Sequence, residues 1–98
     1  MLQENGISGV ERIGILKVVG GKLIRVRLFV EDDKIASIRF TGDFFLYPEE
    51  DIDVLEKELV GTPLEDNILL NRLSSFFQSR ELVGASPEDF MNLIVESR

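Results

Sequence analysis

The feature that most constrains this chain is a change of hydrophobic period near Leu46. Before it, apolar side chains alternate with polar ones, as in half-buried strands, and after it they recur at the spacing of amphipathic helices. A chain that places its strands before its helices is typical of an α+β fold, in which helices cover a face of an antiparallel sheet. We therefore predict a three-stranded antiparallel sheet followed by three helices packed on one face.

Three strands are expected between Glu11 and Thr41, separated by the turn signals Gly20-Gly21 and Asp32-Asp33. The second and third strands alternate, with an apolar face made of Ile24, Val26, Leu28, Val30, Ala36, Ile38 and Phe40. The opposite face carries a stripe of three arginines, Arg25, Arg27 and Arg39. The first strand, about Glu11 to Val18, has apolar residues on both faces, namely Ile13, Ile15 and Leu16, so we expect it to be covered on both sides.

Helical spacing follows the strands. The first helix is predicted from about Pro48 to Val60, with Gly61 ending it, and the second, a central core helix, over 68–80. Between them, Thr62-Pro63-Leu64-Glu65 has the pattern of a capping box, although Asn67 is an alternative cap for the second helix. Ser86-Pro87-Glu88-Asp89 is expected to open the third helix.

The composition excludes several kinds of chemistry. The 98 residues suit one domain, which we place at 11–98, after a loosely ordered arm at 1–10. Cysteine and histidine are both absent, which removes thiolate nucleophiles, disulfides, the usual zinc ligands and the most frequent general base, and we expect no metal. The amino-terminal residues have no secretory signal pattern and no long apolar run follows, so we expect a cytoplasmic protein without membrane association.

The charge is uneven along the chain. The formal net charge is −7, but residues 1–42 hold seven basic and five acidic residues, whereas residues 43–98 hold four and thirteen. The acidic total opposes general binding of nucleic acid. The contrast between a mildly basic first half and an acidic second half suggests two faces that orient the protein on a partner, although solvated charge alone also explains most of these residues.

Two short motifs are candidate contact sites. Gly20-Gly21-Lys22 is either a plain hairpin turn or a contact for a nucleotide or partner, because backbone amides and a lysine can bind anions. In Gly42-Asp43-Phe44-Phe45, glycine permits a bend and aspartate can accept bonds from backbone amides. Adjacent side chains of an extended segment point to opposite sides, so we expect either Phe44 or Phe45 to enter the core while the other faces outward toward a partner. The alternative is that both rings are buried.

Several segments in order resemble a known family. They are the hairpin turn with Gly21-Lys22, the strand Leu23-Ile24-Arg25-Val26, the segment Ile38-Arg39-Phe40-Thr41-Gly42-Asp43-Phe44-Phe45, then Pro48-Glu49-Glu50 and Leu55-Glu56-Lys57-Glu58-Leu59-Val60-Gly61. Together they resemble the C-terminal accessory domain of bacterial lipoate–protein ligase A. Since no large catalytic domain accompanies them, the chain looks like the separate accessory subunit of a split, archaeal-type ligase.

This resemblance implies a non-catalytic protein in a ligase complex. In the family, the catalytic subunit uses ATP and lipoate to form lipoyl-adenylate and then transfers the lipoyl group to a lysine of an acceptor domain. The accessory protein supports the first step, so the resemblance implies a catalytic subunit as direct partner, an acceptor domain as indirect partner, and no cofactor or catalytic residue in this chain.

The interface candidates are therefore Gly20, Gly21, Lys22, Arg25, Arg27, Arg39, Asp43, Phe44 and Phe45. The alternative function is an independent protein- or nucleic-acid-binding module that uses the arginine-bearing sheet face. An autonomous enzyme is the third class, but the paired carboxylates lie at a predicted turn and a helix start, where acidic residues are expected on structural grounds.

Overall fold

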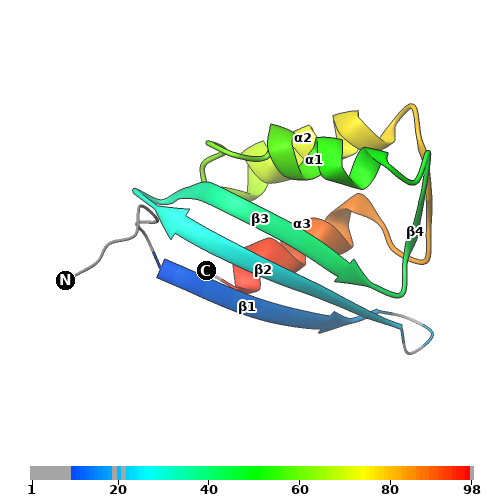
Figure 1. Cartoon of the computed structure of the whole chain (residues 1–98), viewed down its shortest axis with the longest axis horizontal. Coiled ribbons are helices and arrows are strands. Elements are labelled where there is room, and N and C mark those ends of the chain that lie inside the picture. The colour runs from blue at the N-terminus through cyan, green and yellow to red at the C-terminus, as the bar shows by residue number, and fades with distance from the viewer. Residues whose placement is uncertain (1–9, 19, 21, 98) are drawn as a thin grey trace.

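The computed structural model describes residues 10–18, 20 and 22–97, and its main sheet is the predicted antiparallel one. Figure 1 shows its three strands in the order β1 (Val10–Lys17), β2 (Leu23–Glu31) and β3 (Lys34–Gly42). Both predicted hairpin connections are confirmed. The Val18 N–H donates to the Lys22 carbonyl at 2.8 Å across the first, and Asp32 and Asp33 turn the second with φ of 55° and 59°.

The sheet has one apolar face, as the alternation predicts. Ile24, Val26 and Leu28 are buried, while Arg25 and Arg27 between them are exposed. On β3 the inward side chains are Ile35, Ile38 and Phe40, because a register shift opposite Phe29 and Val30 inserts one extra residue. The predicted inward position of Ala36 is therefore wrong in detail: Ala36 is only half-buried, and Ile35 fills the core.

The expectation that β1 is covered on both sides is wrong for the described residues. Ile13 and Ile15 are exposed on the outer face, and Leu16 packs against the core from the inner face. Helix α3 (Pro87–Glu96) passes beneath β1, where a Cβ on Gly14 would collide with the Ser97 hydroxyl. The described residues therefore cover the inner face of β1 and leave Ile13 and Ile15 exposed on the outer face.

A second, two-stranded sheet was not predicted. It pairs β4 (Phe45–Tyr47) with β5 (Glu81–Val83), and Phe45 lies opposite Val83. Three residues are too short to show an alternation, so only the tertiary fold defines these strands. They also shorten the neighbouring helices: α1 (Asp51–Glu58) starts after the turn that follows β4, and α2 (Asp66–Phe77) ends before β5.

Both predicted starts of α2 are wrong. The residue before α2 is Glu65, which makes no side-chain cap hydrogen bond, and Asn67 lies inside the helix. Thr62 and Pro63 instead run beside β3, where the Thr62 carbonyl accepts the Ile35 N–H at 2.9 Å. In contrast, the predicted start of α3 is confirmed, since Ser86 and Asp89 form a reciprocal capping box behind Pro87.

The helices gather on one side of the sheet, as predicted (Figure 1). Helix α3 packs on β1 and β2, α1 packs along β3, and α2 packs on α3. Phe90 of α3 is fully buried and contacts the rings of Phe40, Phe44 and Phe77 at centroid distances of 5.0–5.3 Å. The predicted arm at 1–10 lies outside the described residues except for Val10, which begins β1.

Candidate functional site

Four of the predicted contact residues converge where the β1–β2 hairpin meets the end of β3. We call this region, made of Lys22, Asp43, Phe44 and Phe45, the corner. Asp43 ties it together, because its N–H donates to the Leu23 carbonyl at 2.8 Å and its Oδ2 accepts the Leu23 N–H at 3.1 Å. The expected role of Asp43 as an acceptor for backbone amides is confirmed.

Glycines allow the corner to close. Gly42 has φ of 140°, and a Cβ there would overlap the Leu23 carbonyl oxygen and lie 2.8 Å from the Ile24 Cα. Gly84, with φ of 93°, lies against the same segment, where its Cβ would be 3.1 Å from the Asp43 carbonyl oxygen and 3.5 Å from the Lys22 Nζ. The loop before α3 thus joins the corner, which sequence reasoning missed.

The two phenylalanines of the corner point in opposite directions. Phe44 packs against the core, with its ring edge-on to Phe90 at 5.2 Å, and Phe45 is 53% exposed. The prediction of one inward and one outward ring is confirmed, and the outward ring is Phe45. A hollow of about 370 Å³ lies beside it, lined by Thr41, Glu49, Ile52 and both rings among others. A role for Phe45 in partner binding stays a prediction.

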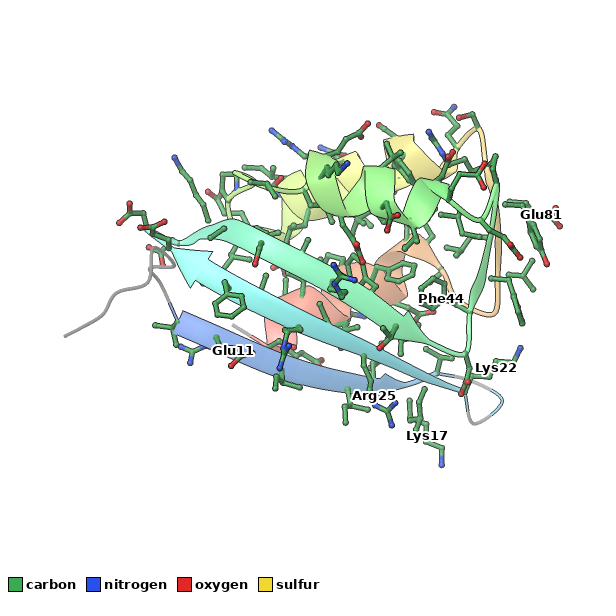
Figure 2. The ribbon with its side chains drawn as sticks, viewed as in Figure 1. Glu11, Lys17, Lys22, Arg25, Phe44 and Glu81 are labelled. Atoms are coloured by element: carbon green, nitrogen blue, oxygen red, sulfur yellow. The ribbon has the colours of Figure 1, made fainter. Side chains whose placement is uncertain are left out.

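The remaining motif residues lie in the hairpin. Gly20 is exposed with φ of 94°, and the half-buried Lys22 lies at the hairpin end and is directed away from Lys17 and Arg25 (Figure 2). Gly21 lies outside the described residues. The hairpin end is therefore locally basic, although the chain as a whole is acidic.

The three arginines lie together on the outer face of the main sheet. Arg27 is directly opposite Arg39 on the neighbouring strand, and Arg25 is opposite Thr41. Arg27 pairs with Glu11 of β1 at 2.8 Å, whereas Arg25 makes no ion pair with any described residue. We call this surface the open sheet face; its other members are Glu11, Ile13, Ile15, Phe29, Ser37 and Thr41.

Among the members of the open sheet face that were not predicted contact residues, two are exposed isoleucines. Ile13 is opposite Arg27, and Ile15 is opposite Arg25, so exposed aliphatic side chains alternate with cations across β1 and β2. The signal that points to them was present in the sequence, since β1 has apolar residues at both parities. An interface role for the arginines stays a prediction.

The far edge of the sheet is closed by a carboxylate. Glu56 of α1 accepts the outward N–H of Phe40 on β3 at 2.7 Å. Partial burial raises the pKa of the Glu56 carboxyl above its ordinary value, while this hydrogen bond and the nearby Arg39 charge act in the opposite direction. Glu56 therefore covers the β3 edge at a desolvation cost.

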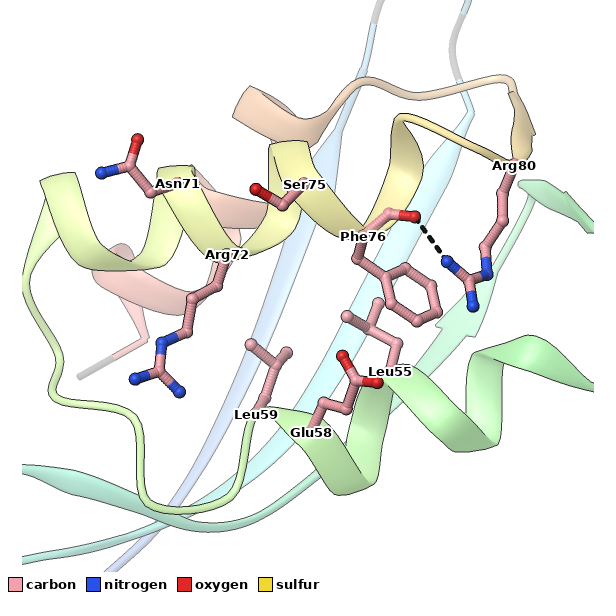
Figure 3. Close-up of a pocket in the computed structure, with 8 residues that line it drawn as sticks. All are labelled: Leu55, Glu58, Leu59, Asn71, Arg72, Ser75, Phe76 and Arg80. Atoms are coloured by element: carbon pink, nitrogen blue, oxygen red, sulfur yellow. Dashed lines mark hydrogen bonds between the residues drawn. The ribbon is translucent and has the colours of Figure 1, made fainter.

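A groove of about 610 Å³ between α1 and α2 contains two further arginines (Figure 3). Arg80 lies over the Phe76 ring at 3.8 Å, donates to the Phe76 carbonyl and pairs with Asp51 at 2.7 Å. Arg72 donates to the Thr62 hydroxyl at 3.2 Å. Both guanidinium groups thus hold elements of this chain together, so the groove is less suited to a ligand than its size suggests.

The described part of the chain has no helix long and apolar enough to cross a membrane. Residues 10–18, 20 and 22–97 also contain no group of three or more acidic side chains arranged to hold a metal ion. The corner and the open sheet face together present basic, aliphatic and aromatic side chains.

Comparison with known proteins defines the family to which this protein belongs. Residues 17–94 match the family model described as the bacterial lipoate protein ligase C-terminus. Because this match spans most of the chain, the protein belongs to the family of lipoate–protein ligase C-terminal domains.

The chain is also similar to two individual proteins. The chain is 35% identical over 74 residues to lipoate-protein ligase A subunit 2 of Thermoplasma acidophilum, covering 74% of this chain and 76% of that protein. It also matches a chain from the solved bi-partite lipoate protein ligase and its E2 lipoyl domain of the same organism, with a TM-score of 0.77, 31% identity, and coverage of 89% of this chain and 97% of that chain. The first relative is thus a second subunit of a lipoate–protein ligase, the second is a chain from the structure of a two-part ligase system, and the predicted family is confirmed.

Proposed function

We propose that this protein is the accessory subunit of a split lipoate–protein ligase. It binds a separate catalytic subunit and promotes the ATP-dependent formation of lipoyl-adenylate, before the lipoyl group is transferred to a lysine of an acceptor domain. The observation that carries this proposal is the structural match to almost the full length of a chain from a two-part ligase. ATP and lipoate are bound by the catalytic subunit, and the use of ATP agrees with a cytoplasmic complex.

The contribution of this chain is one of binding. The corner and the open sheet face present cations, aliphatic side chains and an aromatic ring, which suit contact with another protein. A bound subunit raises the rate of a step only when it prefers the conformation competent for that step. We therefore expect higher affinity for the adenylate-forming state of the catalytic subunit than for its other states.

The test separates the two half-reactions. Pyrophosphate release from ATP and lipoate is measured with the catalytic subunit alone and with saturating amounts of this protein, and we expect the second rate to be higher. Transfer from preformed lipoyl-adenylate to the acceptor domain serves as the control and should change much less. An unchanged rate of pyrophosphate release contradicts the proposed function.

A further inference from the structure

Strand β1 has apolar side chains on both faces, and residues 10–18, 20 and 22–97 bury those of its inner face but not those of its outer face. Its inner face packs on the core and α3, whereas Ile13 and Ile15 on its outer face are 65% and 59% exposed. They are the most exposed large hydrophobic side chains in the described part of the chain. Because Ile13 and Ile15 share one face of the strand, they form a contiguous apolar patch, and such patches are frequent at sites of interaction with other molecules.

The backbone of β1 is open as well. Val18 and Lys22 lie opposite each other when the β1–β2 register is continued by one residue, and the Val18 N–H donates to the Lys22 carbonyl. Val18 and Lys22 are therefore a hydrogen-bonded pair of the antiparallel ladder. Because bonded and non-bonded pairs alternate, Arg12, Gly14 and Leu16 bond to β2, and the residues between them point their N–H and C=O groups away from it. These outward groups belong to Glu11, Ile13, Ile15 and Lys17, and no described strand lies beside them (Figure 1).

The opposite edge of the same sheet is treated differently. On β3, the Phe40 N–H is bonded by Glu56, and the Ile35 N–H and C=O are bonded by Thr62 and Gly61. Natural proteins usually blunt free edges with covers, prolines, bulges or charges. Strand β1 spans eight residues, its register with β2 shows no shift, and it contains no proline. Its charged residues, Glu11, Arg12 and Lys17, lie toward its ends, so the middle of this edge, at 13–16, carries none of these devices.

We propose that β1 is the docking strand of this protein: an exposed strand of the ligase catalytic subunit adds to the free edge of β1, and its apolar side chains cover Ile13 and Ile15. This inference rests on the function proposed above, because the two-part ligase supplies the partner. Strand addition combines main-chain hydrogen bonds with contacts from alternate side chains, and β1 offers both on one edge.

The charges around β1 define the partner strand further. Lys17 and Arg25 flank Ile15, and Glu11 is already paired with Arg27 (Figure 2). The Lys17 end of β1 is therefore basic, so the partner strand should carry an acidic side chain beside the apolar one that covers Ile15.

The first test measures the hydrogen bonding of the β1 backbone amides. Amide hydrogen exchange is followed residue by residue in the full chain, alone and with the catalytic subunit. In the free protein we expect protected amides at Arg12, Gly14 and Leu16 and rapid exchange at Ile13 and Ile15. On complex formation, Ile13 and Ile15 should slow by at least about tenfold, and an absence of this alternating protection overturns the inference.

The second test measures how much the exposed isoleucine side chains of β1 contribute to binding. The double variant Ile13→Lys and Ile15→Lys should weaken the complex by at least about tenfold, because it places charge where apolar contact is expected. Edge lysines are well tolerated in sheets, so the circular dichroism spectrum and melting temperature should stay close to wild type. Val60→Lys is the matched control, since Val60 is another exposed aliphatic residue, at 49%, near the end of α1; its affinity should stay within about twofold.

The outcomes separate this inference from the function on which it rests. If the wild-type protein binds and stimulates the catalytic subunit but the double lysine variant does so equally, the docking strand is wrong and the proposed function stands. Protection of Ile13 and Ile15 already present in the free protein means that another part of this chain, or a second copy, occupies the edge, and this also overturns the inference. If the wild-type protein neither binds nor stimulates a catalytic subunit, both proposals fail.

Discussion

Replacing Gly42 by alanine should destabilise the protein strongly, because two separate effects meet at this residue. The φ of 140° is unfavourable for a residue with a Cβ, at about 1–2 kcal/mol. The new Cβ would also overlap the Leu23 carbonyl oxygen and lie 2.8 Å from the Ile24 Cα. Both obstacles are backbone atoms of β2, so relief requires a shift of the strand, which costs about 1–3 kcal/mol.

The loss of chain entropy in the unfolded state offsets these costs by about 0.4–1 kcal/mol. The net decrease in the free energy of unfolding is therefore about 1–5 kcal/mol. A loss in the middle of this range, about 3 kcal/mol, corresponds to a decrease of roughly 12–24 °C in melting temperature for a domain of this size. Urea-induced unfolding followed by circular dichroism measures it, with the slope of the transition checked for constancy.

Gly61→Ala is the matched control. Gly61 has φ of 86°, also in the region that favours glycine, but its Cβ would meet no described atom within 4 Å. It should lose only about 1 kcal/mol, from backbone strain. Equal losses at the two glycines would refute the argument that close approach of β2, rather than φ alone, requires glycine at position 42.

Three further predictions concern the partner and the pH response. Phe45→Ala should weaken binding to the catalytic subunit by about 2 kcal/mol or more with little change in stability. Phe44→Ala should instead lower the free energy of unfolding by roughly 2–4 kcal/mol, because the Phe44 ring packs on Phe90. Unchanged affinity of Phe45→Ala in a calorimetric titration argues against an interface role for Phe45. Charge reversal to glutamate at the three sheet arginines, Arg25, Arg27 and Arg39, should weaken the complex and reduce its salt dependence, and a complex that keeps both its affinity and its salt dependence excludes that contact. Burial raises the pKa of Glu56 in the folded state, so the free energy of unfolding of the wild type should rise relative to that of Glu56→Gln as pH falls from about 7 to about 4. This gain should be lost as pH rises through the folded-state pKa of Glu56. A difference in the free energy of unfolding that does not change with pH would contradict the dominance of desolvation.

Local patterns account for most of the main elements. The alternation in β2 and β3, the glycine and aspartate turns and the Ser86-Pro87 start of α3 depend on residues close together in the chain, and the structure confirms them. The same is true of the corner, where the opposite directions of Phe44 and Phe45 follow from an extended backbone.

The errors arise where distant segments compete for the same backbone groups. Thr62 and Pro63 have the local pattern of a helix cap, but the free groups of Ile35 on β3 bind this segment instead. Strands β4 and β5 are each three residues long and exist because Phe45 and Val83 are brought opposite each other by the fold. Such pairings depend on long-range geometry, which local spacing does not contain.

The sequence by itself determined the fold class, the family, the arginine face and the apolar character of both sides of β1, because each is a property of residue type and spacing. Only the tertiary structure decided which of these surfaces are free. Helix α3 covers the inner face of β1, while Glu56 and the 61–62 segment close the β3 edge, so the exposed outer face of β1 and its open edge remain. The physical reason is that burial and edge pairing are relations between distant parts of the chain, and they exist only after folding brings those parts into contact.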